Sequence, residues 1–140
     1  MDLIDTLSIS ASGLAAQRVR LQTVASNMAN ARTTRTADGG PYQRRMPVFE
    51  AESESFGGIL EKNLARVRVS EIQADEGDPI RIYDPGHPDA DDFGYVDYPN
   101  VNVLEEMVDL MTTARTYEAN TKVVNTTQDM AGTALEIGRL

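Results

Sequence analysis

Proline is confined to the middle of this chain. All six prolines of the 140-residue sequence lie between Pro41 and Pro99, and seven of the ten glycines lie within residues 37–100. Because a proline in a helix interior costs about 3 kcal/mol, only the two ends are free to form long helices. The sequence therefore predicts a mainly α fold with an N-terminal helix in residues 1–36, a small loop- and strand-rich insert over 37–100, and a C-terminal helix in 101–140.

The C-terminal segment carries an apolar repeat with alternating spacings of four and three, which is the a/d pattern of a heptad helix. The repeat consists of Val103, Met107, Leu110, Ala114, Tyr117, Thr121, Val124, Gln128, Ala131 and Leu135. This seam corresponds to roughly 50 Å of helix at 1.5 Å per residue. Glu105 and Glu106 favour a helix start nearby, and Gly138 is expected to end the helix.

The N-terminal segment has a matching seam that only one charged residue, Arg18, interrupts. Its positions are Ile4, Leu7, Ala11, Leu14, Arg18, Leu21, Ala25 and Met28. Gly13 lies inside this helix, where glycine costs up to about 1 kcal/mol relative to alanine. The helix is expected to end near Asn30, because the following residues are rich in Thr, Gly and Pro.

The two seams are predicted to pair as a coiled-coil-like hairpin. A two-helix seam built largely from small residues is marginal by itself, so we expect assembly with other copies or other chains to stabilise it. The polar surface of both helices, rich in Ser, Thr, Asn and Gln, suits burial among neighbouring helices. The predicted assembly interface comprises Leu7, Ala11, Leu14, Leu21, Ala25, Asn27, Met28, Asn30, Val103, Met107, Leu110, Ala114, Tyr117, Asn120, Val124, Ala131 and Leu135.

The insert contains short segments with the alternating pattern of half-buried strands. The clearest are residues 64–72 and 79–83, and residues 46–49 and 95–96 are weaker candidates. We expect a small apolar cluster between these strands, made of Phe49, Phe56, Val67, Val69, Ile80, Ile82 and Tyr83.

Charge and composition exclude several functional classes. The formal net charge is −9, and the insert alone carries fourteen acidic against six basic side chains. Nucleic-acid binding requires clustered Lys and Arg, so an acidic chain is a poor candidate for it. The chain has no Cys and a single His, which removes thiol chemistry, disulfides and most zinc sites. No cofactor and no small-molecule substrate is predicted.

One segment of the insert, residues 83–92, concentrates potentially catalytic groups, with four carboxylates and the sole imidazole, His87. A calcium loop starting at Asp89 fails, because Phe93 stands at its fifth position and Asn100 where a bidentate Glu is needed. A metal-assisted hydrolase would need an oriented partner for His87. The neighbouring prolines favour a structural turn with solvated acids instead.

A basic pair, Arg44 and Arg45, follows Gly39-Gly40-Pro41-Tyr42. Such a pair is most often a solvated turn, and an ion pair with an acidic neighbouring subunit is the less common use.

Several runs of residues resemble the bacterial flagellar rod, hook and hook-associated proteins. The N-terminal runs Ala11–Arg18 and Ala25–Ala31 are similar to the signature of that axial family. The runs Tyr83–Asp91, Gly94–Asn102 and Ala114–Asn120 resemble the proximal rod proteins within it. Arg32 departs from the family pattern, which usually has Asn or Ser there.

This resemblance implies a non-enzymatic building block of the flagellar rod, located in the basal body and spanning the periplasm. It implies terminal helices that stack helically as an inner tube, with the insert facing outwards, so that torque passes from motor ring to hook. Implied partners are other copies of the chain, other rod proteins, the rod-base adaptor and the inner-membrane ring. The family is exported by the flagellar export apparatus without a cleaved signal peptide.

Two other functions stay open at the level of sequence. One is a self-contained binding module, whose helical hairpin presents the acidic insert to a basic partner. The other is a metal-dependent hydrolase centred on His87.

Overall fold

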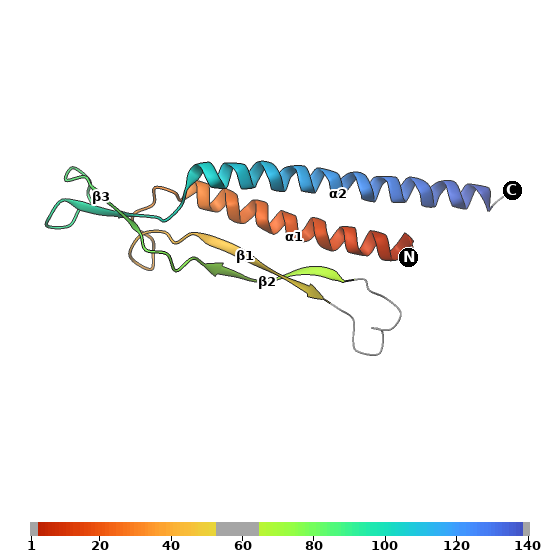
Figure 1. The fold of residues 1–140 in the computed structure, drawn as a ribbon, viewed down its shortest axis with the longest axis horizontal. Helices are drawn as coiled ribbons and strands as arrows, with labels where there is room; N and C mark the ends of the chain where they lie inside the picture. The colour runs from red at the N-terminus through yellow and green to blue at the C-terminus, as the bar shows by residue number, and fades with distance from the viewer. Residues whose placement is uncertain (1–2, 53–64, 139–140) are drawn as a thin grey trace.

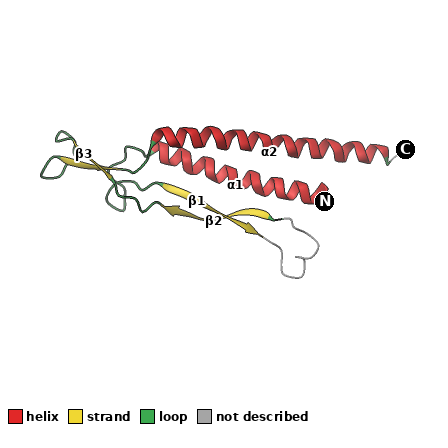
Figure 2. Cartoon of the chain, viewed as in Figure 1, coloured by secondary structure: helices red, strands yellow, loops and turns green. Residues whose placement is uncertain are grey.

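Two long helices dominate the computed structural model, which describes residues 3–52 and 65–138 (Figure 1). They lie side by side and antiparallel, so that both chain termini are at the same end of the molecule. The part of the chain between the two helices forms two antiparallel two-stranded ribbons (Figure 2). This confirms the predicted mainly α fold with a small β insert. The elements are α1 (Leu3–Ala29), β1 (Arg45–Glu52), β2 (Arg66–Ala74), β3 (Ile80–Tyr83), β4 (Tyr95–Tyr98) and α2 (Val103–Ile137).

The ends of the helices are set by side chains that satisfy free backbone groups. The Asn30 amide donates to the Ser26 carbonyl at the end of α1, at 2.9 Å. The Asn102 side chain caps the start of α2 by accepting from the Leu104 N–H. Gly138 ends α2 as predicted, but its φ of −74° is right-handed, so the position needs no glycine for its backbone conformation.

The helix pairing uses only half of the predicted α2 seam. Leu110, Val124 and Ala131 are half-buried, as the heptad pattern predicts. At alternate positions of the repeat, the residue that packs against α1 is the one just before the predicted residue. Thr113 and Thr127 are two such residues, and both are buried. These are smaller side chains than the methionine, valine and leucine on the outer face of α2, and smaller side chains let two helices approach more closely.

A close approach between the helices also explains the glycine inside α1. A Cβ added to Gly13 would lie 3.2 Å from the Asn120 amide nitrogen, which is tighter than ordinary van der Waals contact. The helical cost of Gly13 therefore accompanies a close fit with α2.

Helix α1 lies between α2 and the β1–β2 ribbon (Figure 1). The ribbon pairs Arg45 with Ala74 and Glu52 with Arg66, with an irregularity between Val48 and Phe49. It touches α1 along its length, and the Val67 N–H donates to the Ser12 hydroxyl at 3.2 Å. Among the described residues, the ribbon makes no contact with α2.

The apolar cluster expected inside the insert does not form. Phe49, Val67 and Val69 belong to the β1–β2 ribbon, whereas the three predicted residues 80, 82 and 83 belong to the separate β3–β4 ribbon. Phe49 is 39% exposed and Tyr83 63% exposed. A two-stranded ribbon has no second layer to cover it, so its apolar side chains stay partly in water. Phe56, the remaining predicted member, lies outside the described residues.

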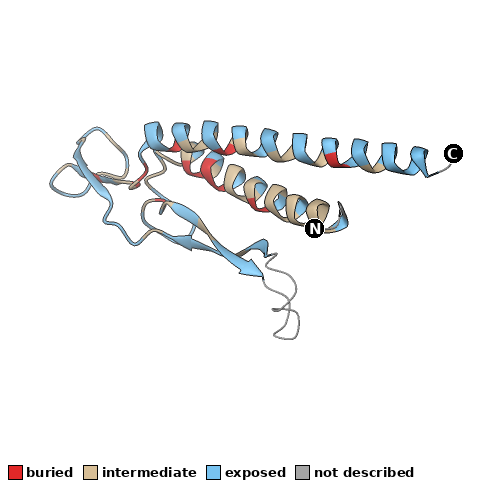
Figure 3. Ribbon diagram, turned by 45° about the vertical axis from the view of Figure 1, so that its right-hand side comes forward, coloured by how far each residue is buried: buried red, intermediate tan, exposed pale blue. Residues whose placement is uncertain are grey.

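The chain buries little of its own surface (Figure 3). Its accessible area is 10264 Å², whereas a compact monomer of this mass exposes about 7,100 Å². The buried apolar residues in the described part are Ala16, Val24, Tyr42, Val96, Pro99 and Val101. Across residues 3–52 and 65–138, neither helix is long and apolar enough to span a membrane.

Candidate assembly surface and the polar junction beneath it

Most of the outer surface of α2 is exposed in the monomer (Figure 3), and its first turns carry a patch of large apolar side chains. Leu104, Met107 and Met111 recur at spacings of three and four, which places them on one side of a helix. They are 70%, 44% and 56% exposed. The exposed large apolar residues of α2 are Val103, Leu104, Met107, Val108, Met111, Tyr117, Val123, Met130, Leu135 and Ile137.

The uncovered side of α1 has fewer large apolar residues. Its exposed positions are four alanines, Ala11, Ala15, Ala25 and Ala29, together with Ile4, Arg18 and Gln22. The two terminal helices thus present different surfaces, with several alanines on α1 and large apolar side chains on the first turns of α2.

The predicted interface residues fall into three groups in the monomer. Those exposed are Ala11, Ala25, Val103, Met107, Tyr117 and Leu135. Those half-buried are Leu7, Leu14, Leu21, Met28, Asn30, Leu110, Ala114, Asn120, Val124 and Ala131. Asn27 alone is fully buried, at 1% exposure. The role of all seventeen residues in assembly stays a prediction.

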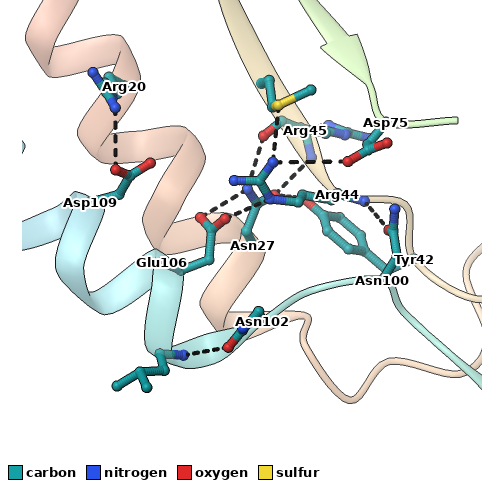
Figure 4. Close-up of polar contacts among 12 residues, drawn as sticks. Arg20, Asn27, Tyr42, Arg44, Arg45, Asp75, Asn100, Asn102, Glu106 and Asp109 are labelled. Atoms are coloured by element: carbon teal, nitrogen blue, oxygen red, sulfur yellow. Dashed lines mark hydrogen bonds and ion pairs between the residues drawn. The ribbon is translucent and has the colours of Figure 1, made fainter. Parts of the chain in front are cut away.

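Asn27 is the centre of a polar junction where α1, α2 and the insert meet (Figure 4). Its amide nitrogen donates to the Arg45 carbonyl at 2.9 Å and to Glu106 Oε2 at 3.1 Å. Its oxygen accepts from the Tyr42 hydroxyl and from the Arg45 N–H, both at 2.9 Å. All four hydrogen-bonding positions of this buried amide are therefore filled.

Glu106 brings a buried carboxylate into the same junction. It lies in the first turn of α2 and is 1% exposed. Arg44 Nε donates to its Oε1 at 2.7 Å, which is a charge-assisted contact (Figure 4). Arg44 also lies 3.8 Å from Asp75.

The backbone of Arg44 is held by two later parts of the insert. Its N–H donates to the Asn100 side chain at 3.2 Å, just before α2. Its carbonyl accepts from the Asp75 N–H at 2.7 Å, just after β2. The interpretation of Arg44 as part of a solvated turn is therefore wrong, because its guanidinium pairs with a buried acid of the same chain.

The sequence pattern placed Glu106 among acids that favour a helix start and missed its burial. The heptad pattern did contain this information. Shifting its positions by one residue places Glu106, Thr113 and Thr127 on the same stripe of the helix.

The acids of residues 84–97 are used in the turns of that loop. Asp91 Oδ1 accepts from the N–H groups of Phe93 and Tyr95 at 2.9 and 2.8 Å, and its other oxygen pairs with Arg81. The Tyr95 N–H above all lowers the pKa of Asp91 below its usual value, and the Phe93 N–H and Arg81 act in the same direction against the effect of burial. His87 Nδ1 accepts from the Asp89 N–H at 3.1 Å. These contacts support the structural-turn interpretation.

The loop borders an open groove of about 450 Å³, shared with the turn that follows α1. Thr34 donates to Asp89 at 2.8 Å there, and Arg35 lies 3.6 Å from the same carboxylate. Within residues 3–52 and 65–138, no group of three His, Cys, Asp or Glu is placed to hold a metal ion.

Two family models of flagellar basal-body rod proteins match the segments that contain the terminal helices. Residues 7–35 match the family described as flagella basal body rod protein. Residues 94–137 match the family described as flagellar basal body rod FlgEFG protein C-terminal. The two matches cover α1 with its following turn, and β4 with α2. The class of protein defined here is thus the flagellar basal-body rod proteins.

Individual relatives cover the whole chain. The flagellar basal-body rod protein FlgC of Bacillus subtilis is 43% identical over 99% of this chain and 100% of its own length. The FlgC proteins of Aquifex aeolicus and Salmonella typhimurium are 44% and 37% identical, over 93% and 99% of this chain and 92% and 100% of their own lengths. The chain belongs to the family of flagellar basal-body rod proteins FlgC. It is a structural subunit of the rod and not an enzyme, so the hydrolase interpretation of His87 is wrong.

Proposed function

We propose that this subunit builds the proximal part of the rod by helical assembly through its terminal helices, and that it transmits torque from the motor ring to the hook. The observation that carries the proposal is the uncovered apolar face of α2, with Leu104 and Met111 more than half exposed. These residues belong to a patch in the first turns of α2. A monomer rarely leaves a large contiguous apolar patch in water, and such patches mark interaction sites.

The difference between the two helix faces favours an open assembly. The large apolar side chains on the first turns of α2 and the exposed alanines of α1 are complementary in size, so a face of one copy fits a different face of the next. A contact between two different surfaces is heterologous, and repeated heterologous contacts give rings or helical filaments. Residues 1–36 and 101–140 then form the axial core, and many such contacts in parallel bear the torque.

The insert, residues 37–100, faces outwards in this proposal. It holds most of the acidic side chains and both ribbons, whereas the uncovered apolar helix faces lie outside it. Other copies of the chain and other rod proteins pack against the helices, and the rod-base adaptor and the inner-membrane ring are the proposed neighbours at the base.

Export precedes assembly in the same proposal. The subunit passes the flagellar export apparatus without a cleaved signal peptide and reaches its place in the periplasm-spanning rod. Helices that are marginal alone stay largely unfolded during passage and fold when they meet neighbours, as in coupled folding and binding. A chain without cysteine also forms no disulfide on leaving the cytoplasm.

The test replaces Met111 on the exposed α2 face. Met111→Asp puts a charge into the proposed interface, so we expect secretion to continue while incorporation into purified basal bodies and swimming motility are lost. Met111→Leu keeps the volume and apolar character and should retain both. Normal basal bodies from the Met111→Asp strain would contradict assembly through this face.

A further inference from the structure

We propose that the Arg44–Glu106 pair makes the pairing of α1 and α2 conditional on prior docking of the insert. This inference rests on the contacts within one chain and not on the proposed mode of assembly.

The first step is the burial of Glu106. Because its residue is 1% exposed, closing α1 against α2 at this end takes its carboxylate out of water. Its side-chain hydrogen-bond partners are Arg44 Nε at 2.7 Å and the Asn27 amide at 3.1 Å. Asn27 is neutral, so the charge of Glu106 is compensated by Arg44, a residue of the insert.

The second step is the position of Arg44. Its backbone N–H donates to Asn100, and its carbonyl accepts from the Asp75 N–H. Arg44 is therefore fixed only when Asp75, next to the end of the β1–β2 ribbon, and the chain before α2 are in place. Until then, helix pairing would bury a carboxylate without its cation. An uncompensated buried charge is strongly destabilising, by an amount that lowers the folded fraction about 100-fold or more.

The third step is that α1 depends on the insert at the same point. Three of the four hydrogen bonds of the Asn27 side chain go to insert residues, two to the Arg45 backbone and one to Tyr42. The Asn27 amide bonds both the N–H and the carbonyl of Arg45, as the backbone of a neighbouring strand would. Asn27 and Glu106 therefore lack most of their polar partners until the insert docks, which couples the pairing of the helices at this point to the insert.

The test is a double-mutant cycle in the full chain, using Arg44→Ala, Glu106→Gln and the double variant. Amide hydrogen exchange is measured in trimethylamine N-oxide, an osmolyte that strengthens burial in marginal proteins. The amides of residues 20–29 and 104–113 report on this end of the helix pair.

We expect Arg44→Ala to lower protection at these amides about 100-fold or more, because the Glu106 charge is stranded. The double variant should recover at least about 10-fold of that loss, because a neutral amide is less costly to bury than a carboxylate. Arg20→Ala is the matched control. It removes an ion pair between the helices, with Asp109 at 3.3 Å, that is partly exposed and owes nothing to the insert. Its loss should stay within about 5-fold.

Three results would overturn the proposal. One is an Arg44→Ala loss no larger than that of Arg20→Ala. Another is an equal loss in Arg44→Ala and the double variant, which would indicate lost packing in place of a stranded charge. The third is a wild-type chain that gains no protection in α1 and α2 at any osmolyte concentration.

Discussion

Removing the Asn27 side chain tests how much stability the polar junction provides. Asn27→Ala leaves four groups without this partner: the Tyr42 hydroxyl, the Glu106 carboxylate, and the N–H and carbonyl of Arg45. Arg45 is exposed, so water can replace the amide at its backbone. Tyr42 and Glu106 are buried, at 8% and 1% exposure, so water cannot replace the hydrogen bond that each loses.

The magnitude follows from these two buried groups. A buried neutral hydroxyl that loses a partner costs about 1 kcal/mol, and a hydrogen bond to a charged group contributes about 1.5–3 kcal/mol. We therefore expect Asn27→Ala to lower the free energy of unfolding by about 2.5–4 kcal/mol. Against the roughly 5–15 kcal/mol typical of a domain, this is a large share.

The assay is circular dichroism at 222 nm across a series of urea and trimethylamine N-oxide concentrations, extrapolated linearly. Asn30→Ala, which removes another asparagine side chain three residues further along the chain, is the control. The Asn30 side chain bonds locally to Ser26 and Thr33 at the end of α1, so its removal should cost about 1 kcal/mol. If Asn27→Ala were no more destabilising than Asn30→Ala, the account of the junction would be refuted.

Three further predictions concern the insert and the junction. Asn27→Asp should be at least as destabilising as Asn27→Ala near pH 7, because it places a second carboxylate beside Glu106; a milder effect in the same titration would contradict the assigned contact. Gly94→Ala should disrupt the loop of residues 84–97, because φ is +80° and the new Cβ would lie 2.9 Å from the Tyr83 ring. Gly86→Ala is the control, because its new Cβ meets nothing closer than 3.7 Å, and it should be neutral. Limited proteolysis of the two variants distinguishes these outcomes. The Tyr95 N–H above all lowers the pKa of Asp91, so its contribution to the loop should be complete above about pH 3.9 and fade as the pH falls through the lower folded-state pKa. Carboxyl titration by NMR checks this, and an Asp91 midpoint at or above the ordinary value would count against the loop contacts.

The architecture was predictable because it depends on properties that are local in the chain. Confinement of proline to the middle and two heptad repeats are enough to predict terminal helices, and Gly138 marks the end of α2. The turn interpretation of residues 83–92 likewise followed from Pro85 and Pro88, which flank His87.

The junction was not predictable in the same way, because it depends on pairs far apart in sequence. Arg44 and Glu106 are 62 positions apart, and Asn27 and Glu106 are 79 apart. Heptad counting treats an acid as a surface residue, so it assigned the seam to Met107 and missed the burial of Glu106. The apolar cluster failed for a related reason: strand patterns do not say which strands share a sheet, and here they form two separate ribbons.

The position of α1 between α2 and the β1–β2 ribbon has a consequence for sequence change. An enlarged side chain on a covered face of α1 must displace either a helix or a ribbon of its own chain, whereas one on the outer face of α2 meets only solvent until a neighbouring subunit arrives. Gly13 and Ala16, on α1, are correspondingly small, and Met107 and Met111, on α2, are large. In a free subunit, substitutions that add bulk should therefore be tolerated unequally by the two helices, and α1 should be the more sensitive one.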